Sequence, residues 1–133
     1  MLLAFSSTEA AALVEKSPIL RRESSFHTIS TSTLSIPEKV YYYAEVHGVN
    51  GTEMFRTVLC ESSASSTIQS RHLDPTGPNG REDSWGLAQI HLPSHPSVSR
   101  EMAQDPDFAL EFMAMKFAKG KQKLWTCYKN ESQ

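Results

Sequence analysis

The chain lacks several features that mark common classes of protein. No segment has a run of about 18 apolar residues, so none is expected to span a membrane. A formal net charge of −2 provides no strong positive field, which disfavours nucleic-acid binding. The mildly apolar start from Met1 to Leu13 has no basic flank and is interrupted by polar residues, so it is a poor secretory signal. Composition therefore leaves the cellular location unassigned.

Cysteine is also scarce, and Cys60 and Cys127 are the two in the chain. They allow one disulfide, but two buried free thiols are an equal alternative on composition alone. With 133 residues, of which 39% are hydrophobic, the chain has enough material for one compact domain with one core. We expect that domain to act as a monomer.

Composition changes sharply near residue 36. Between Ser24 and Ser35, eight of the twelve positions are Ser or Thr, and such a stretch has little surface to bury. We therefore expect residues 1–35 to be a flexible lead, residues 36–129 to be the folded domain, and residues 130–133 to be a short tail.

Within the domain, apolar residues recur at helical spacing between capping residues and glycines, and this pattern predicts three helices. They run from Pro37 to His47, from a cap at Thr52 to Glu61, and from Pro106 to a stop at Gly120. The stretch from Ser62 to Arg81 is polar and rich in Pro and Gly, which predicts a loop. The short apolar stretch from Ser84 to Ile90 fits either a strand or a buried turn. The domain is thus predicted to be mainly α.

Glu61 is the candidate catalytic residue. It lies on the flank of the apolar helix face made by Met54 and Val58, and it ends its helix. Partial burial and the negative pole of the helix dipole both favour the neutral carboxyl group and raise its pKa. A carboxylic acid that keeps its proton near neutral pH is what cleavage of a glycosidic bond needs. The alternative is a solvated helix-terminal Glu without a function.

Five short segments in a fixed order give this candidate a context. They are Tyr43-Ala44-Glu45-Val46-His47-Gly48-Val49, Cys60-Glu61-Ser62-Ser63, Ser84-Trp85-Gly86-Leu87-Ala88-Gln89-Ile90 and Asp105-Pro106-Asp107-Phe108-Ala109, followed by Trp125-Thr126-Cys127-Tyr128 near the end. Together they resemble the lysozyme-like superfamily, and most closely its soluble lytic transglycosylase (SLT) type, over residues 36–129. In that family a helix-terminal Glu-Ser holds the acid and a Gly-Leu-Met-Gln-like segment lines the glycan cleft.

The resemblance implies an α+β lysozyme-like fold, in which a long loop and a short β segment form a glycan cleft. It also implies cleavage of the β-1,4 bond between N-acetylmuramic acid and N-acetylglucosamine in peptidoglycan, at the cell wall, with no cofactor and no metal. Glu61 would be the acid. The residues that would bind the glycan are Ser62, Ser84, Trp85, Gly86, Gln89 and Tyr128. Trp85 could stack on a sugar ring or belong to the core.

Two departures from the family pattern bear on the reaction. No Ala-Tyr-Asn-Ala-Gly segment, whose Tyr supports the acid in many relatives, is present. Ser84 stands where animal-type lysozymes have their second carboxylate, and its neighbour Asp83 should point the opposite way on extended backbone. With Glu82 also expected to be turned away or solvated, a lytic transglycosylase that makes 1,6-anhydromuramic acid is favoured over a hydrolytic lysozyme.

Two further classes of function remain as alternatives. A lysozyme-like module could bind glycan, or build part of a phage particle, without turnover, although the intact Glu61-Ser62 pair argues against this. His91 and His95 have the spacing of zinc ligands on a helix, which would suit a zinc peptidase. Pro93 and Pro96 exclude a regular helix there, so the metal site is the weaker hypothesis.

Overall fold

A computed structural model describes residues 30–129, and the chain falls into two compact units. The first unit, Met1–Thr33, is described only from residue 30, where Thr31–Thr33 form one 3-10 turn. The second unit, Leu34–Gln133, contains all the other elements found within residues 30–129. The predicted flexible lead therefore lies mostly outside the described residues, and the predicted tail lies wholly outside them.

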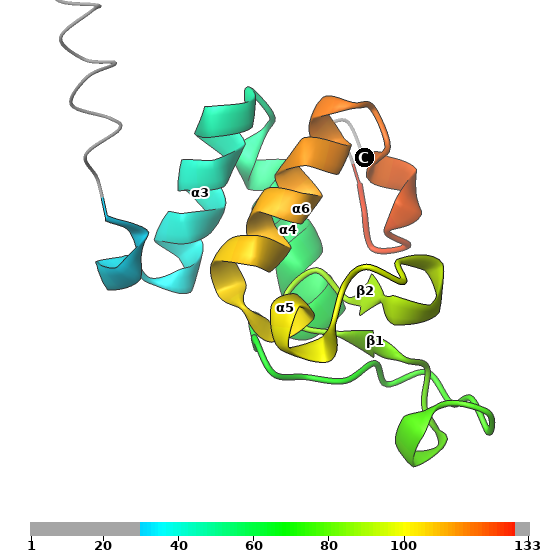
Figure 1. The fold of residues 1–133 in the computed structure, drawn as a ribbon. Coiled ribbons are helices and arrows are strands. Elements are labelled where there is room, and N and C mark those ends of the chain that lie inside the picture. Colours follow the sequence, from blue (N-terminus) through cyan, green and yellow to red (C-terminus); the bar gives the residue numbers. More distant parts are fainter. Residues whose placement is uncertain (1–29, 130–133) are drawn as a thin grey trace, which may run out of the picture. The chain divides into compact units, whose positions relative to one another are not determined.

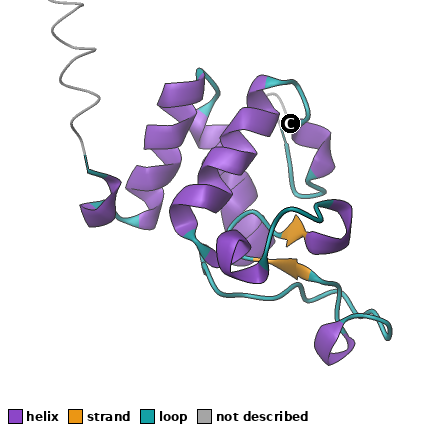
Figure 2. Cartoon of the chain, viewed as in Figure 1, coloured by secondary structure: helices purple, strands orange, loops and turns teal. Residues whose placement is uncertain are grey.

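The second unit is mainly helical, with one small two-stranded sheet (Figures 1 and 2). Its helices and strands are α3 (Ile36–His47), α4 (Gly51–Ser62), β1 (Ser84–Trp85), β2 (Ile90–His91), α5 (Arg100–Gln104) and α6 (Pro106–Ala118). This confirms the predicted mainly α class with a short β segment. Across residues 30–129, every helix is too short or too polar to cross a membrane.

Helix α3 begins and ends as its sequence predicts. The Ser35 side chain accepts a hydrogen bond from the backbone N–H of Glu38, and the Glu38 carboxylate bonds back to Ser35, which completes a capping box. At the other end Gly48 adopts the left-handed conformation with φ 66°. Pro37 lies in the first turn, where the absence of its N–H leaves no hydrogen bond unmade.

Helix α4 starts slightly earlier than predicted. Asn50, and not Thr52, is the N-cap, because its side-chain oxygen accepts a hydrogen bond of 3.0 Å from the backbone N–H of Glu53. The helix ends at Ser62, and Ser63 follows in the left-handed region with φ 54°. Glu61 therefore lies in the last turn of α4, as the sequence predicted.

Asp105 separates the last two helices. It ends α5, and its carboxylate caps α6 by accepting hydrogen bonds from the backbone N–H groups of Asp107 and Phe108. Helix α6 was predicted from this cap and the following proline. Helix α5, capped by Ser99, was not predicted because it has only five residues and carries no clear apolar period.

The core forms where α3 packs against both α4 and α6. Its largest fully buried apolar side chains are Val40, Met54, Val58, Leu87, Leu110 and Met113. Burial of side chains of this size is the main source of stability for a domain of this length. At one edge of the α3–α6 contact, Lys39 forms an ion pair of 2.7 Å with Asp107.

The segment between α4 and α5 supplies the small sheet. As predicted, the chain after Ser62 is loop, apart from a 3-10 turn at Pro78–Gly80. Strands β1 and β2 then form an antiparallel hairpin in which Trp85 pairs with Ile90. The stretch from Ser84 to Ile90 is therefore both strand and buried turn. The Trp125 indole N–H donates to the Ala88 carbonyl at 2.7 Å, which attaches the closing segment of the chain to this hairpin.

Candidate functional site

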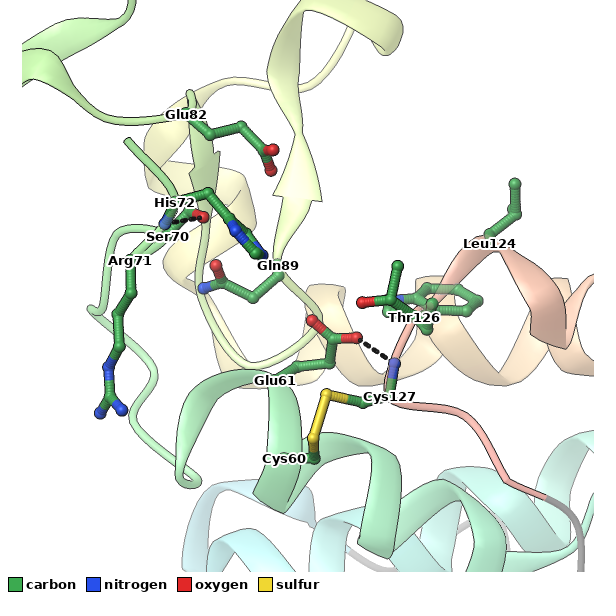
Figure 3. A pocket seen from close by; sticks show the side chains of 11 residues that line it. Cys60, Glu61, Ser70, Arg71, His72, Glu82, Gln89, Leu124, Thr126 and Cys127 are labelled. Carbon is green, nitrogen blue, oxygen red and sulfur yellow. Dashed lines mark hydrogen bonds between the residues drawn. A yellow bond between two sulfur atoms is a disulfide. The ribbon is translucent and has the colours of Figure 1, made fainter. Parts of the chain in front are cut away.

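A polar pocket of about 350 Å³ opens at the end of α4 (Figure 3). Its walls come from the last turn of α4, the long loop after it, the β hairpin and the closing segment. The residues that line it are Cys60, Glu61, Ser70, Arg71, His72, Glu82, Gln89, Leu124, Trp125, Thr126 and Cys127. Segments far apart in the sequence thus meet around one helix-terminal carboxyl group.

Glu61 is half-buried, and its carboxyl group points into the pocket (Figure 3). One carboxyl oxygen accepts a hydrogen bond of 3.1 Å from the backbone N–H of Cys127. Burial raises the pKa of Glu61 above its ordinary value, and the negative charge of Glu82 adds to this rise. The Cys127 hydrogen bond and the nearby His72 act in the opposite direction but do not outweigh burial. Glu61 therefore keeps its proton to a higher pH than a solvent-exposed glutamate does.

A disulfide joins Cys60 to Cys127. The sequence left this bridge and two free thiols as equal alternatives, and the structure has the bridge. One cysteine directly precedes Glu61, and the other supplies the N–H that binds its carboxyl group. The bond therefore fixes the closing segment against the candidate acid.

Glu82 lies in the same pocket, and its expected orientation was wrong. Ser84 is buried, and its hydroxyl donates to the Glu82 carboxylate at 2.5 Å. The backbone bends at Asp83, where the Ser84 N–H donates to the Glu82 carbonyl at 2.9 Å, and this tight turn brings the two side chains together. The intervening Asp83 does not line the pocket, and it accepts a hydrogen bond of 2.7 Å from the Trp85 indole. The premise that the acid has no second carboxylate beside it therefore fails.

Gln89 reaches the pocket from the end of the hairpin turn. Its backbone has φ 47°, a left-handed conformation that is uncommon for a residue with a side chain. The side-chain nitrogen donates to the carbonyls of Ile68 and Gly86 at 3.2 and 3.0 Å. With the nitrogen engaged by backbone, the carbonyl oxygen of the amide is the atom that can face a ligand.

The sequence did not single out the loop residues of the pocket. Ser70, Arg71 and His72 come from the predicted loop, and the Ser70 hydroxyl accepts a hydrogen bond from the His72 backbone N–H (Figure 3). Thr126 comes from the closing segment. A loop carries no periodic signal that shows which of its side chains turn inward, so only the tertiary structure identifies these residues.

Five predicted glycan-binding residues lie outside the pocket lining, and the structure gives each a supporting contact. Ser62 is buried and donates to the Val58 carbonyl, and Ser84 holds Glu82. Trp85 is buried beneath the Arg100 guanidinium, 4.2 Å from its ring. Gly86 packs against α5. Tyr128 packs edge-on against Phe117, and its hydroxyl donates to Glu53.

The two histidines with zinc-like spacing do not converge on a ligand set. His91 shares a hydrogen bond of 2.8 Å with the Ser94 hydroxyl, and His95 packs edge-on against Phe112. Within the described stretch, residues 30–129, no three His, Cys, Asp or Glu side chains are grouped so that they could hold a metal ion. The zinc-peptidase hypothesis therefore has no site in this part of the chain.

Comparison with models of known protein families, with curated proteins and with solved structures finds no significant match. The functional interpretation therefore depends on the geometry of the pocket and on the sequence motifs. The pocket offers one carboxyl group with a raised pKa, a second carboxylate, an imidazole, an amide and hydroxyl groups. This set suits proton transfer to and from an uncharged, hydroxyl-rich ligand.

Proposed function

We propose that this chain cleaves the β-1,4 glycosidic bond between N-acetylmuramic acid and N-acetylglucosamine in peptidoglycan, with Glu61 as the catalytic acid. The observation that carries the proposal is the half-buried helix-terminal carboxyl group, which has a raised pKa and faces a polar pocket. The substrate class is supported by the ordered set of lysozyme-like motifs, in which Glu61-Ser62 and Gly86-Leu87-Ala88-Gln89 are the most specific. The same motifs support a lysozyme-like fold.

In the first step, the Glu61 carboxyl group donates its proton to the glycosidic oxygen, and the bond from this oxygen to the anomeric carbon breaks. Positive charge develops at the anomeric carbon and the ring oxygen. The carbonyl oxygen of Gln89 and the N-acetyl group of the substrate can stabilise this charge. The reaction can then finish in one of two ways, each of which forms a new bond to the anomeric carbon. The muramic acid 6-hydroxyl closes onto its own anomeric carbon, as in a lytic transglycosylase, or water adds, as in a lysozyme.

A non-catalytic glycan-binding module is the second candidate. It would use the same polar pocket, but it would gain nothing from an acid with a raised pKa. Burial of an ionisable group lowers stability when the group is charged, so a carboxyl group kept in this position favours a catalytic role. The two candidates differ in one measurable respect, because only the enzyme shortens glycan strands.

Incubation of purified peptidoglycan with the pure protein, followed by mass spectrometry of the fragments, tests the proposal. We expect disaccharide-peptide products, and we expect Glu61→Gln to lower turnover by at least about 100-fold while the fold stays intact. Glu45→Gln, which removes an exposed carboxylate from α3, serves as the matched control and should cleave normally. Near-normal activity in a folded Glu61→Gln protein would contradict the role of Glu61. Binding without cleavage by the wild type would favour the glycan-binding module.

A further inference from the structure

Two carboxyl groups, those of Glu61 and Glu82, line the same pocket. Figure 3 shows Glu61 on the α4 side and Glu82 on the hairpin side, with both carboxyl groups directed into the pocket. They are close enough for the charge of Glu82 to raise the pKa of Glu61. The pocket of about 350 Å³ provides space for a sugar ring and water between these walls.

The structure holds Glu82 firmly in this orientation. Its backbone N–H donates to the His72 carbonyl at 2.9 Å, and its own carbonyl accepts from the Ser84 N–H at 2.9 Å. The side chain of Ser84 is 1% exposed and donates to the carboxylate at 2.5 Å. A buried hydroxyl that binds one carboxylate oxygen leaves the other oxygen to face the pocket. Such fixed placement is what a group needs in order to act on a bound water molecule.

We infer that Glu82 is a second catalytic carboxylate, which activates a water molecule and makes the reaction a hydrolysis with inversion of configuration. The inference rests on the proposed function, because it needs the glycosidic bond and the acid Glu61. It also assigns Ser84 as the positioning residue for Glu82.

Glu61 gives its proton to the glycosidic oxygen, and the bond between that oxygen and the anomeric carbon breaks. A water oxygen bonds to the anomeric carbon from the opposite face, and the proton that it loses passes to the Glu82 carboxylate. Proton exchange with solvent then returns Glu61 to the acid and Glu82 to the carboxylate. One water is consumed, and the new muramic acid end is a reducing sugar in the α configuration.

The wild-type protein alone provides the first test. Cleavage of peptidoglycan in H₂¹⁸O should place one ¹⁸O at each new reducing end, which mass spectrometry detects. Rapid NMR of the fresh products should show the α anomer before mutarotation. Products that carry only 1,6-anhydromuramic acid ends, without ¹⁸O, would overturn the role of Glu82 and leave Glu61 in place. A β anomer as the first product would overturn it as well.

Glu82→Gln provides the second test, with Asp83→Asn as the matched control. Gln can still accept the Ser84 hydrogen bond but cannot take up a proton. We expect hydrolysis to fall by at least about 100-fold, and the residual product to shift toward 1,6-anhydro ends, which require Glu61 alone. Asp83→Asn removes the charge of the adjacent residue, which does not line the pocket, and should keep wild-type products.

The outcomes separate this inference from the proposed function. Hydrolysis at the wild-type rate by Glu82→Gln would overturn the base role, whereas loss of activity in Glu61→Gln would still support the acid. If the wild type cleaves no peptidoglycan, the proposed function fails, and the role of Glu82 fails with it. Circular dichroism of each variant shows that a loss of activity is not a loss of fold.

Discussion

At the scale of the residue, the candidate acid is held in a position that lowers the stability of the fold when the residue is charged. Burial raises the pKa of Glu61, so the folded state binds its proton more tightly than the unfolded state does. The contribution of protonated Glu61 to the free energy of unfolding is fully present below its ordinary pKa of 4.5. This contribution is lost as the pH rises through the raised pKa of the folded state.

Glu61→Gln should therefore raise the melting temperature at neutral pH, by about 1–4 °C, even though it removes activity. Gln can still accept the Cys127 hydrogen bond, and it has no charge to desolvate. The difference from the wild type should shrink as the pH is lowered below 4.5, where Glu61 is protonated in both the folded and the unfolded state. Calorimetry of both proteins, from neutral pH to below pH 4.5, measures the difference in melting temperature. A stability loss at neutral pH, or a difference that does not change with pH, would contradict this account.

At the scale of the element, the helices could be predicted and much of the pocket could not. Local signals suffice for α3, α4 and α6, because a capping residue such as Ser35 or Asp105 and the following apolar period lie within one stretch of chain. The position of Glu61 follows from its helix. Glu82 could not be placed from strand alternation, because the backbone bends at Asp83 between it and Ser84. Ser70, His72 and Thr126 depend on loop paths that only tertiary contacts determine.

The hairpin depends on a close approach between its turn and α5. Gly86 has φ 79°, and a Cβ atom there would lie 1.9 Å from the Ala103 carbonyl oxygen. Gly86→Ala should therefore cost roughly 2–4 kcal/mol, from the strained backbone and the displaced helix together. Because the turn also carries Gln89 into the pocket, activity should fall as well.

Gly48→Ala is the matched control for this prediction. Gly48 has φ 66°, but an added Cβ would meet no atom within 4 Å, so only the conformational cost of about 1 kcal/mol should appear. Chemical denaturation of the two variants gives the comparison. Equal losses of stability would show that the contact with α5 has no energetic weight.

At the scale of the whole molecule, the Cys60–Cys127 disulfide ties the closing segment of the chain to α4. The cysteines are 67 residues apart, so the bond removes much conformational freedom from the unfolded chain. Replacing both with Ser should lower the free energy of unfolding by about 2–4 kcal/mol, and it should lower activity because the Cys127 N–H is no longer held at Glu61.

Denaturant titration with and without a reducing agent measures how much the Cys60–Cys127 disulfide contributes to the free energy of unfolding. The reducing agent should destabilise the wild type and leave the double Ser variant unchanged. A thiol titration of the denatured, unreduced wild type should find no free thiol. Two free thiols per chain would rule out the bridge, and an unchanged midpoint on complete reduction would deny it a stabilising role.

The Cys60–Cys127 disulfide also determines what happens when a protease cuts the chain. The exposed loop carries Arg71 and Arg81, both within reach of a trypsin-like enzyme, and both lie between the two cysteines in the sequence. A cut at either site yields two fragments that remain covalently joined. Glu61 stays with the first fragment and the closing segment with the second, so a cut after Arg71 or Arg81 breaks the chain without releasing either side of the pocket.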